Sequence, residues 1–262
     1  MTRTDDLTPA WATDLAILEL GGSTVEDRGD HLLVRTPANP DYHWGNVVLV
    51  LDASTVDDAD RWLGAFVAAF PDAGWRALGL PVMPADVAAW DRHGVRLETD
   101  EVLVARTQPR RTDVPPSYAV RQITGADWEL VVAKEMADNA RTGEYEPVGH
   151  ERFVRAMAAT RAGLSKRGAA AFFGAFSDGE LVADLGIVRC GRRARYQAVG
   201  TAPEHRGRGL ASHLLGVAAQ WAAEGGCDEW VIVTESTNPA GRVYRRAGFA
   251  PAAASVQAYR AP

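Results

Sequence analysis

The chain has 262 residues, 47% of them hydrophobic, and a formal net charge of −6 at pH 7. This acidic balance argues against nucleic acid as a partner, because nucleic-acid-binding domains usually carry a basic surface, and no stretch approaches the 18 apolar residues of a membrane span. Because the residues around Asp5 and Asp6 lack a signal-peptide pattern, we expect a cytoplasmic protein without membrane partners.

The first 108 residues alternate between strand-like and helical patterns. Strands are predicted at residues 31–35, 45–51, 74–80 and 95–106, and helices at 56–70 and 84–93. The following segment, 109–117, holds three prolines and no apolar periodicity. This composition is typical of a linker.

After the linker the pattern predicts a strand at 118–123, helices at 126–139 and 148–166, and a hairpin of 170–176 with 180–190. A turn at Ser177-Asp178-Gly179 joins the hairpin strands. A further strand at 193–201 leads into the first motif.

The first motif is the run from Arg206 to Ala211, between a strand that Pro203 ends and an apolar-periodic helix. Gly207 and Gly209 leave the main-chain N–H groups uncovered where the dipole of the next helix concentrates partial positive charge. Arg206 and Arg208 add formal charge suited to a polyphosphate. The run therefore predicts a site for a nucleotide-type cofactor with a pyrophosphate. It matches neither the GxxxxGK[ST] loop nor the complete GxGxxG fingerprint.

The second motif lies about 30 residues further along. A buried strand at 228–235 is followed by Asn238, which can cap a short helix containing Tyr244, and Gly248 suits the left-handed residue that ends it. The two motifs together resemble the two signatures of the GNAT superfamily of N-acyltransferases.

The resemblance implies an α/β fold with a mixed sheet, in two tandem GNAT-like units. We expect a degenerate N-terminal domain (1–108), a linker (109–117) and a complete GNAT domain (118–262) whose central sheet splays at Gly200. Residues 89–95 can be aligned with residues 243–249, and in this alignment Trp90 corresponds to Tyr244. At the place that corresponds to the first motif, the N-terminal unit has Asp52-Ala53-Ser54-Thr55, without the arginines and glycines. We expect the N-terminal unit to bind no cofactor.

The resemblance also implies direct transfer of an acetyl group from acetyl-CoA to a primary amine of a small molecule or protein, by a monomer or homodimer. The cofactor-binding residues it implies are Val199, Gly200, Thr201, Arg206, Gly207, Arg208, Gly209, Leu210, Ala211 and Asn238. Tyr244 is implied as the general acid. The alternative is a regulatory or scaffolding module that binds acyl-CoA without turnover.

The general base is left open, because the strand at 193–201 contains no Asp, Glu or His. Glu144 and Glu146, between the first two helices of the GNAT domain, are hypotheses for this role, and a solvated loop is the alternative for both. We predict no metal site, and expect His205 and His213 to contact solvent or neighbouring side chains. Residues 1–112 carry 10 Arg against 18 Asp and Glu, a balance that would attract a cationic amine; an ordinary solvated surface is the alternative.

Overall fold

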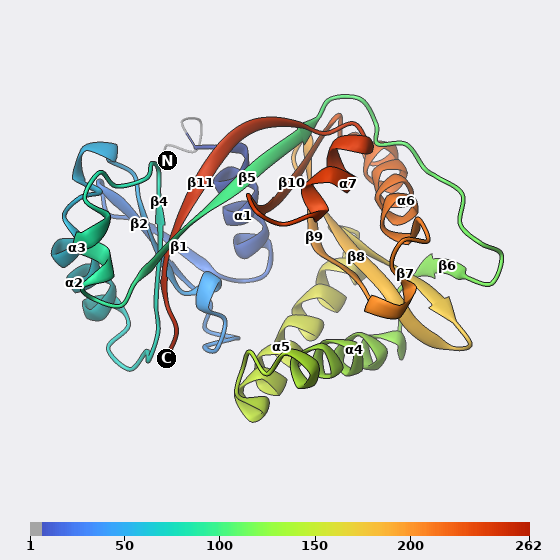
Figure 1. The fold of residues 1–262 in the computed structure, drawn as a ribbon, viewed down its shortest axis with the longest axis horizontal. Coiled ribbons are helices and arrows are strands. Elements are labelled where there is room, and N and C mark those ends of the chain that lie inside the picture. The colour runs from blue at the N-terminus through green and yellow to red at the C-terminus, as the bar shows by residue number, and fades with distance from the viewer. Residues whose placement is uncertain (1–6) are drawn as a thin grey trace. The chain divides into compact units, whose positions relative to one another are not determined.

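The computed structural model describes residues 7–262 (Figure 1). Residues 1–6, which include Asp5 and Asp6, lie outside the described part. The chain forms two compact units: unit 1 takes the residues up to Val102 with 233–238 and 252–262, and unit 2 takes 103–232 with 239–251. Three strands, β5, β10 and β11, have residues in both units. The α/β class with mixed strand directions is confirmed.

Unit 1 is a sheet with helices, in the strand order β1-β2-β3-β4-β11. Its elements are α1 (Pro9–Leu20), β1 (Thr24–Asp27), β2 (His31–Arg35), η2 (His43–Gly45), β3 (Val47–Val50), η3 (Ala53–Thr55), α2 (Ala59–Ala69), β4 (Arg76–Leu80), α3 (Val87–Asp91), β5 (Arg96–Ala105) and β11 (Ala250–Arg260). Strands β3 and β4 are parallel, and β11 pairs antiparallel with β4, Val256 opposite Leu80.

Two tryptophans of unit 1 form part of its core, and Trp90 is the residue that aligns with Tyr244 of unit 2. Trp90 is fully buried, and its indole N–H donates to the carbonyl of Val56 at 3.1 Å. Trp62 donates in the same way to Thr55 at 2.8 Å. The carboxylate of Asp52 accepts a hydrogen bond from the N–H of Ser54. In the loop that corresponds to the first motif, a carboxylate of the loop itself thus occupies a main-chain donor. These contacts stabilise a core.

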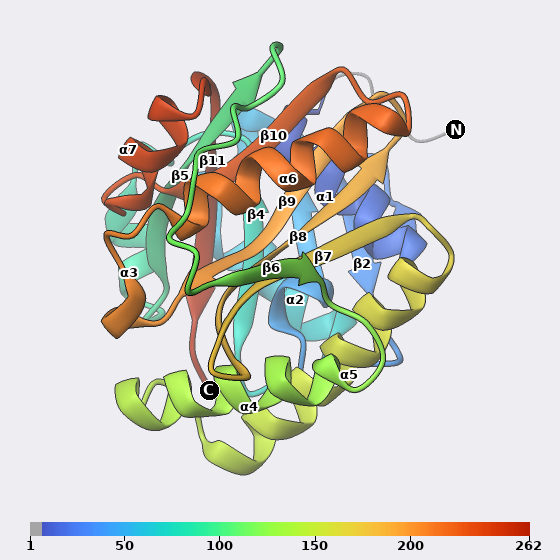
Figure 2. The same ribbon diagram turned by 90° about the vertical axis from the view of Figure 1, so that its right-hand side faces the viewer.

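Unit 2 is a sheet in the order β10-β9-β8-β7-β6, with α6 on one face and α4 and α5 on the other (Figures 1 and 2). Its elements are β6 (Ala119–Gln122), α4 (Asp127–Thr142), α5 (Pro147–Lys166), β7 (Ala170–Ser177), β8 (Glu180–Cys190), β9 (Arg193–Thr201), η4 (Pro203–His205), α6 (Leu210–Glu224), β10 (Glu229–Glu235) and α7 (Ala240–Arg246). Neighbouring strands from β6 to β9 are antiparallel, whereas β9 and β10 are parallel.

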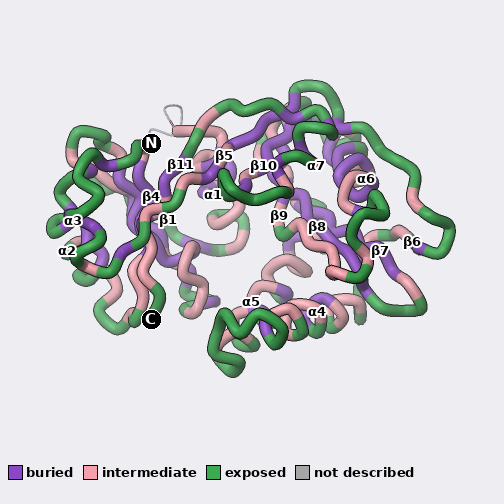
Figure 3. Tube along the Cα trace, viewed as in Figure 1, coloured by how far each residue is buried: buried purple, intermediate pink, exposed green. Residues whose placement is uncertain are grey.

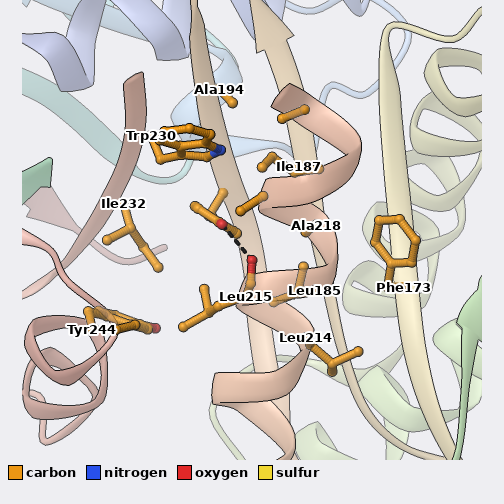
Figure 4. Close-up of a cluster of buried hydrophobic side chains, with 14 of the residues drawn as sticks. Phe173, Leu185, Ile187, Ala194, Leu214, Leu215, Ala218, Trp230, Ile232 and Tyr244 are labelled. Carbon is orange, nitrogen blue, oxygen red and sulfur yellow. Dashed lines mark hydrogen bonds between the residues drawn. The ribbon is translucent and has the colours of Figure 1, made fainter. Parts of the chain in front are cut away.

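The core of unit 2 lies between α6 and the sheet, where Figure 3 shows the strands largely buried and Figure 4 shows the side chains. Leu214, Leu215 and Ala218 form the inner stripe of α6 and are fully buried. The hydroxyl of Tyr196 on β9 donates to the carbonyl of Leu215 at 2.7 Å, the dashed line in Figure 4. This bond fixes α6 against the strand that precedes the first motif.

The proline-rich segment 109–117 has no helix or strand and packs against α6. A Cβ atom on Gly216 would come within 2.4 Å of the Cα atom of Arg111. The carbonyl of Thr112 contacts the imidazole of His213, which is buried. The expectation that His213 meets solvent or side chains is therefore wrong, because a backbone carbonyl takes its ring nitrogen.

Three elements toward the ends of the chain differ from the sequence analysis. Helix α1, strand β1 and strand β11 were not predicted. No helix within residues 7–262 is long and apolar enough to cross a membrane.

Candidate active site

Strand β9 carries a β-bulge just before it reaches the first motif. Asp184 of β8 is opposite Gly200, but Gly186 is opposite Gln197, so two residues of β9 face one residue of β8. Ala198 inside the bulge has a φ of 49°, which is uncommon for a residue with a side chain. A bulge turns the main chain out of the regular ladder. It therefore leaves main-chain groups near Val199 free to meet a ligand.

The other edge of β9 also leaves the regular sheet. Its parallel pairing with β10 covers Arg193–Arg195, opposite Glu229–Val231, and β9 then continues to Thr201. The pairing thus ends earlier than Gly200, where we expected the splay. The half-buried residues Val199, Gly200 and Thr201 lie on this last part of the strand.

The first motif has the backbone conformation that its glycines predict. Gly207 and Gly209 have φ values of 74° and 79°, and Gly209 is the N-cap of α6 without a side-chain cap. A Cβ atom on Gly207 would meet nothing within 4 Å. Among the described residues, no backbone carbonyl accepts from the N–H groups of residues 207–209. We call these donors and the N-terminus of α6 the anion cradle, because uncovered N–H groups at a helix N-terminus could bind an anion.

The arginines of the motif are tied to the protein around the cradle. Arg206 donates from Nε to the carbonyl of Thr201 at 3.1 Å. Arg208 donates to the carbonyl of Glu204 at 3.0 Å and to the hydroxyl of Tyr118, which shares a 2.9 Å hydrogen bond with His205. The side-chain partner expected for His205 is thus Tyr118. Leu210 is buried and anchors the first turn of α6 in the core, and Ala211 is half-buried.

The second motif supplies a buried tyrosine. Tyr244 on α7 is 5% exposed, and burial raises its pKa to about 12, opposed by the charge of Arg195. Figure 4 shows Tyr244 at the edge of the core cluster with its hydroxyl directed toward α6. Gly248 ends the helix with a φ of 105°, as expected.

The start of the same helix differs from the expectation. Helix α7 begins at Ala240 with Pro239 as its N-cap, so Asn238 lies one residue before that cap. Pro239 already has helical dihedral angles and lacks an N–H group, which allows it to take this position. Asn238 is exposed, and its main-chain N–H donates to the carbonyl of Glu235.

The two candidate bases in the loop between α4 and α5 have different environments. Glu146 is the N-cap of α5, and its carboxylate accepts from the N–H groups of Gly149 at 2.7 Å and Val148 at 2.9 Å. These hydrogen bonds lower the pKa of Glu146, which makes it a weaker proton acceptor. Glu144 is exposed on the same loop.

Sequence reasoning missed a buried ion pair next to β9. Lys134 of α4 extends its ammonium to within 3.1 Å of Oδ1 of Asp184 on β8, and both side chains are less than a tenth exposed. Asp184 is opposite Gly200 in the ladder. The available signal was an aspartate inside the apolar run 181–188. A strand covered on both faces rarely contains an unpaired charge.

A surface hollow at the opposite end of β9 is a separate feature. It is lined by Cys190, Arg192, Arg193, Asp228 and Glu229, and its charges are paired, Arg192 with Asp228 and Arg193 with Glu229. Cys190 and Cys227 are both free thiols. Within residues 7–262 no group of three or more His, Cys, Asp or Glu side chains could hold a metal ion.

Comparison with known proteins decides the family. Residues 133–249 match the model of the acetyltransferase (GNAT) family. A mycothiol acetyltransferase of Clavibacter sepedonicus is 34% identical over an aligned region that covers 83% of this chain and 82% of that protein. The chain belongs to the GNAT acetyltransferase family. It is accordingly an acyltransferase enzyme, and the family generally uses acetyl-CoA.

Solved GNAT structures share the fold over nearly the whole chain. A GCN5-related N-acetyltransferase from Kribbella flavida has a TM-score of 0.64 at 18% identity, covering 95% of both chains. A tandem GNAT protein from the clavulanic acid biosynthesis pathway has a TM-score of 0.57 at 16% identity, covering 94% of this chain and 88% of that one. The expected tandem arrangement of GNAT-like units is therefore confirmed at the level of the fold.

Proposed function

We propose that the protein transfers the acetyl group of acetyl-CoA to a primary amine of a small molecule or protein, by direct attack in a ternary complex. The observation that carries this proposal is the row of unpaired main-chain donors at residues 207–209, directly after a bulged and partly unpaired strand. Such a row suits a pyrophosphate, and the strand before it suits the arm that extends from the pyrophosphate to the thioester.

The cofactor-binding roles follow from this geometry. We assign the main chain from Arg206 to Ala211 to the pyrophosphate. Main-chain groups of Val199, Gly200 and Thr201 would bind the pantetheine arm and polarise the thioester carbonyl, because preorganised N–H groups directed at a developing oxyanion usually give the largest catalytic contribution. We also assign Asn238 to cofactor binding, beside the pantetheine arm, as the family signature implies.

Tyr244 is the proposed general acid. Its pKa of about 12 keeps the phenol protonated at neutral pH, so that a proton is available for the departing thiolate. The attacking amine must also lose a proton. Glu144 and Glu146 stay candidates for accepting it, and the structure adds a third carboxylate, Asp184.

The acceptor is proposed to be a cationic amine. Residues 1–112 have a net charge of −8, against +2 for residues 113–262, and an acidic surface speeds the arrival of a cation. The name of the Clavibacter relative makes mycothiol-type compounds the first acceptors to test, followed by polyamines, aminoglycosides, amino acids and peptides.

An assay of CoA release with this panel, beside calorimetric titration with acetyl-CoA, tests the proposal. We expect micromolar-range binding and acceptor-dependent release of CoA. Tight binding without transfer to any acceptor would favour the non-catalytic module. If acetyl-CoA does not bind, the main chain from Arg206 to Ala211 is not a pyrophosphate site.

A further inference from the structure

Burying the ion pair of Lys134 and Asp184 costs free energy of folding. The two side chains are 9% and 7% exposed, and a charge taken out of water loses several kcal/mol of hydration that its partner only partly restores. Oδ1 of Asp184 is buried, and the ammonium of Lys134, 3.1 Å away, is the one donor near it among residues 7–262. Asp184 thus has capacity to accept a proton.

The pair lies against the part of β9 assigned to the thioester. Asp184 is opposite Gly200. A Cβ atom on Gly200 would stand 2.9 Å from Nζ of Lys134 and 3.6 Å from Oδ1 of Asp184. The bulge lies at the two preceding residues of the same strand, Ala198 and Val199. The carboxylate is therefore beside the main chain that is proposed to hold the reacting carbonyl.

The charges around Asp184 come from both helices on that face of the sheet. Helix α4 contributes Lys134, Glu135 and Asp138, the last at 3.5 Å from Nζ of Lys134, and α5 contributes Arg161. Burial raises the pKa of the Asp184 carboxyl, which Lys134 opposes. A carboxylate with a raised pKa is the stronger base at neutral pH.

We propose that Asp184 is the group that takes the proton from the attacking ammonium, directly or through one water, and that Lys134 holds it in place. This inference rests on the proposed acetyl transfer. In the step, the ammonium gives its proton to the carboxylate, and the nitrogen lone pair forms the new bond to the thioester carbon. The C–S bond then breaks, and the thiolate takes a proton from Tyr244. The nitrogen still carries one proton more than the neutral amide, and this proton passes to the Tyr244 phenolate, directly or through water, which restores the phenol. The proton on Asp184 passes to solvent when the product leaves.

The first experiment compares Asp184→Asn with Asp138→Asn, which removes the exposed carboxylate that faces the same lysine. Two acceptors are used at pH 7, an alkylamine that is protonated and a hydrazide that is neutral. With the alkylamine we expect Asp184→Asn to lower kcat/KM by about 10²-fold or more. With the hydrazide the loss should be less than about fivefold, because a neutral nucleophile loses its proton only after attack. Asp138→Asn should resemble the wild type with both.

A merely structural role for Asp184 predicts an equal loss with both acceptors, and that outcome would overturn the inference. So would full activity of Asp184→Asn with the alkylamine. If the wild type transfers acetyl to neither acceptor, the proposed function itself fails. Acetyl-CoA titration and thermal melting verify that each variant is folded.

A second variant keeps the test decisive if Asp184→Asn does not fold. Lys134→Gln removes the positive charge that lowers the pKa of Asp184. The acidic limb of the kcat/KM profile should therefore move to higher pH. An unmoved limb in a folded Lys134→Gln protein would show that Asp184 does not accept the proton.

Discussion

The ammonium nitrogen of Lys134 lies 2.9 Å from the position that a Cβ atom on Gly200 would occupy. Real Cβ atoms essentially never make so short a contact, so a side chain at position 200 would force the ammonium of Lys134 to move. The lack of a side chain at position 200 thus allows the ion pair of Lys134 on α4 and Asp184 on β8 to lie against β9.

Gly200→Ala should therefore displace the ammonium of Lys134 without removing any charge. Because the end of a lysine side chain moves easily, we expect the melting temperature to change little. A shift of about 1 Å at a catalytic group can cost about 10²-fold, and we expect kcat to fall toward that extent. Gly64→Ala, where a Cβ atom meets nothing within 4 Å, is the matched control and should keep full kcat. Equal rates for the two variants would contradict this view of Gly200.

Tyr244→Phe should lower kcat by about 10²-fold and leave acetyl-CoA affinity within about twofold. Because burial puts the pKa of Tyr244 at about 12, its loss of a proton should not limit the wild-type rate below pH 10. Steady-state kinetics between pH 6 and 10 measure both effects. Tyr196→Phe is the control: loss of its bond to Leu215 should cost about 1 kcal/mol of stability but no chemistry. An unchanged rate for Tyr244→Phe would remove the residue from its proposed role.

Gly207→Ala should weaken acetyl-CoA binding by about tenfold, or about 1.4 kcal/mol. An alanine at a φ of 74° is strained by roughly 1–2 kcal/mol, and relaxation would turn the main-chain donors away from the cradle. Gly226→Ala imposes similar strain at a φ of 90°, also in open space, beyond the other end of α6. Calorimetry should find weaker binding for the first variant only, while both should lose stability in urea.

Glu146→Gln should lower the melting temperature at neutral pH, because a charged cap of α5 becomes neutral. The pKa of Glu146 is lower in the folded chain than its ordinary value of 4.5. Its stabilisation is therefore present above that value and is lost as the pH falls through the folded value. The melting temperatures of wild type and variant should converge in acid. Glu144→Gln, on the same exposed loop, should melt like the wild type throughout.

Most of the strands and helices could be predicted, since each depends on periodicity within a short window. Strand β2 has the predicted bounds, and the cradle was predictable because a left-handed backbone at Gly207 and Gly209 is a local property. The ion pair of Lys134 and Asp184 was not, because it depends on the packing of α4 on β8. The pairing of β11 with β4 was missed for the same reason: nothing near residue 256 indicates a partner at residue 80.

That long-range pairing affects how the protein is made. Strand β4 is synthesised long before its antiparallel neighbour in β11, because Leu80 is paired with Val256. Until then one edge of β4 has unpaired N–H and C=O groups, a known template for aggregation. Completion of the first unit must wait until β11 has been synthesised, and a chaperone that shields this edge would raise the yield of native enzyme.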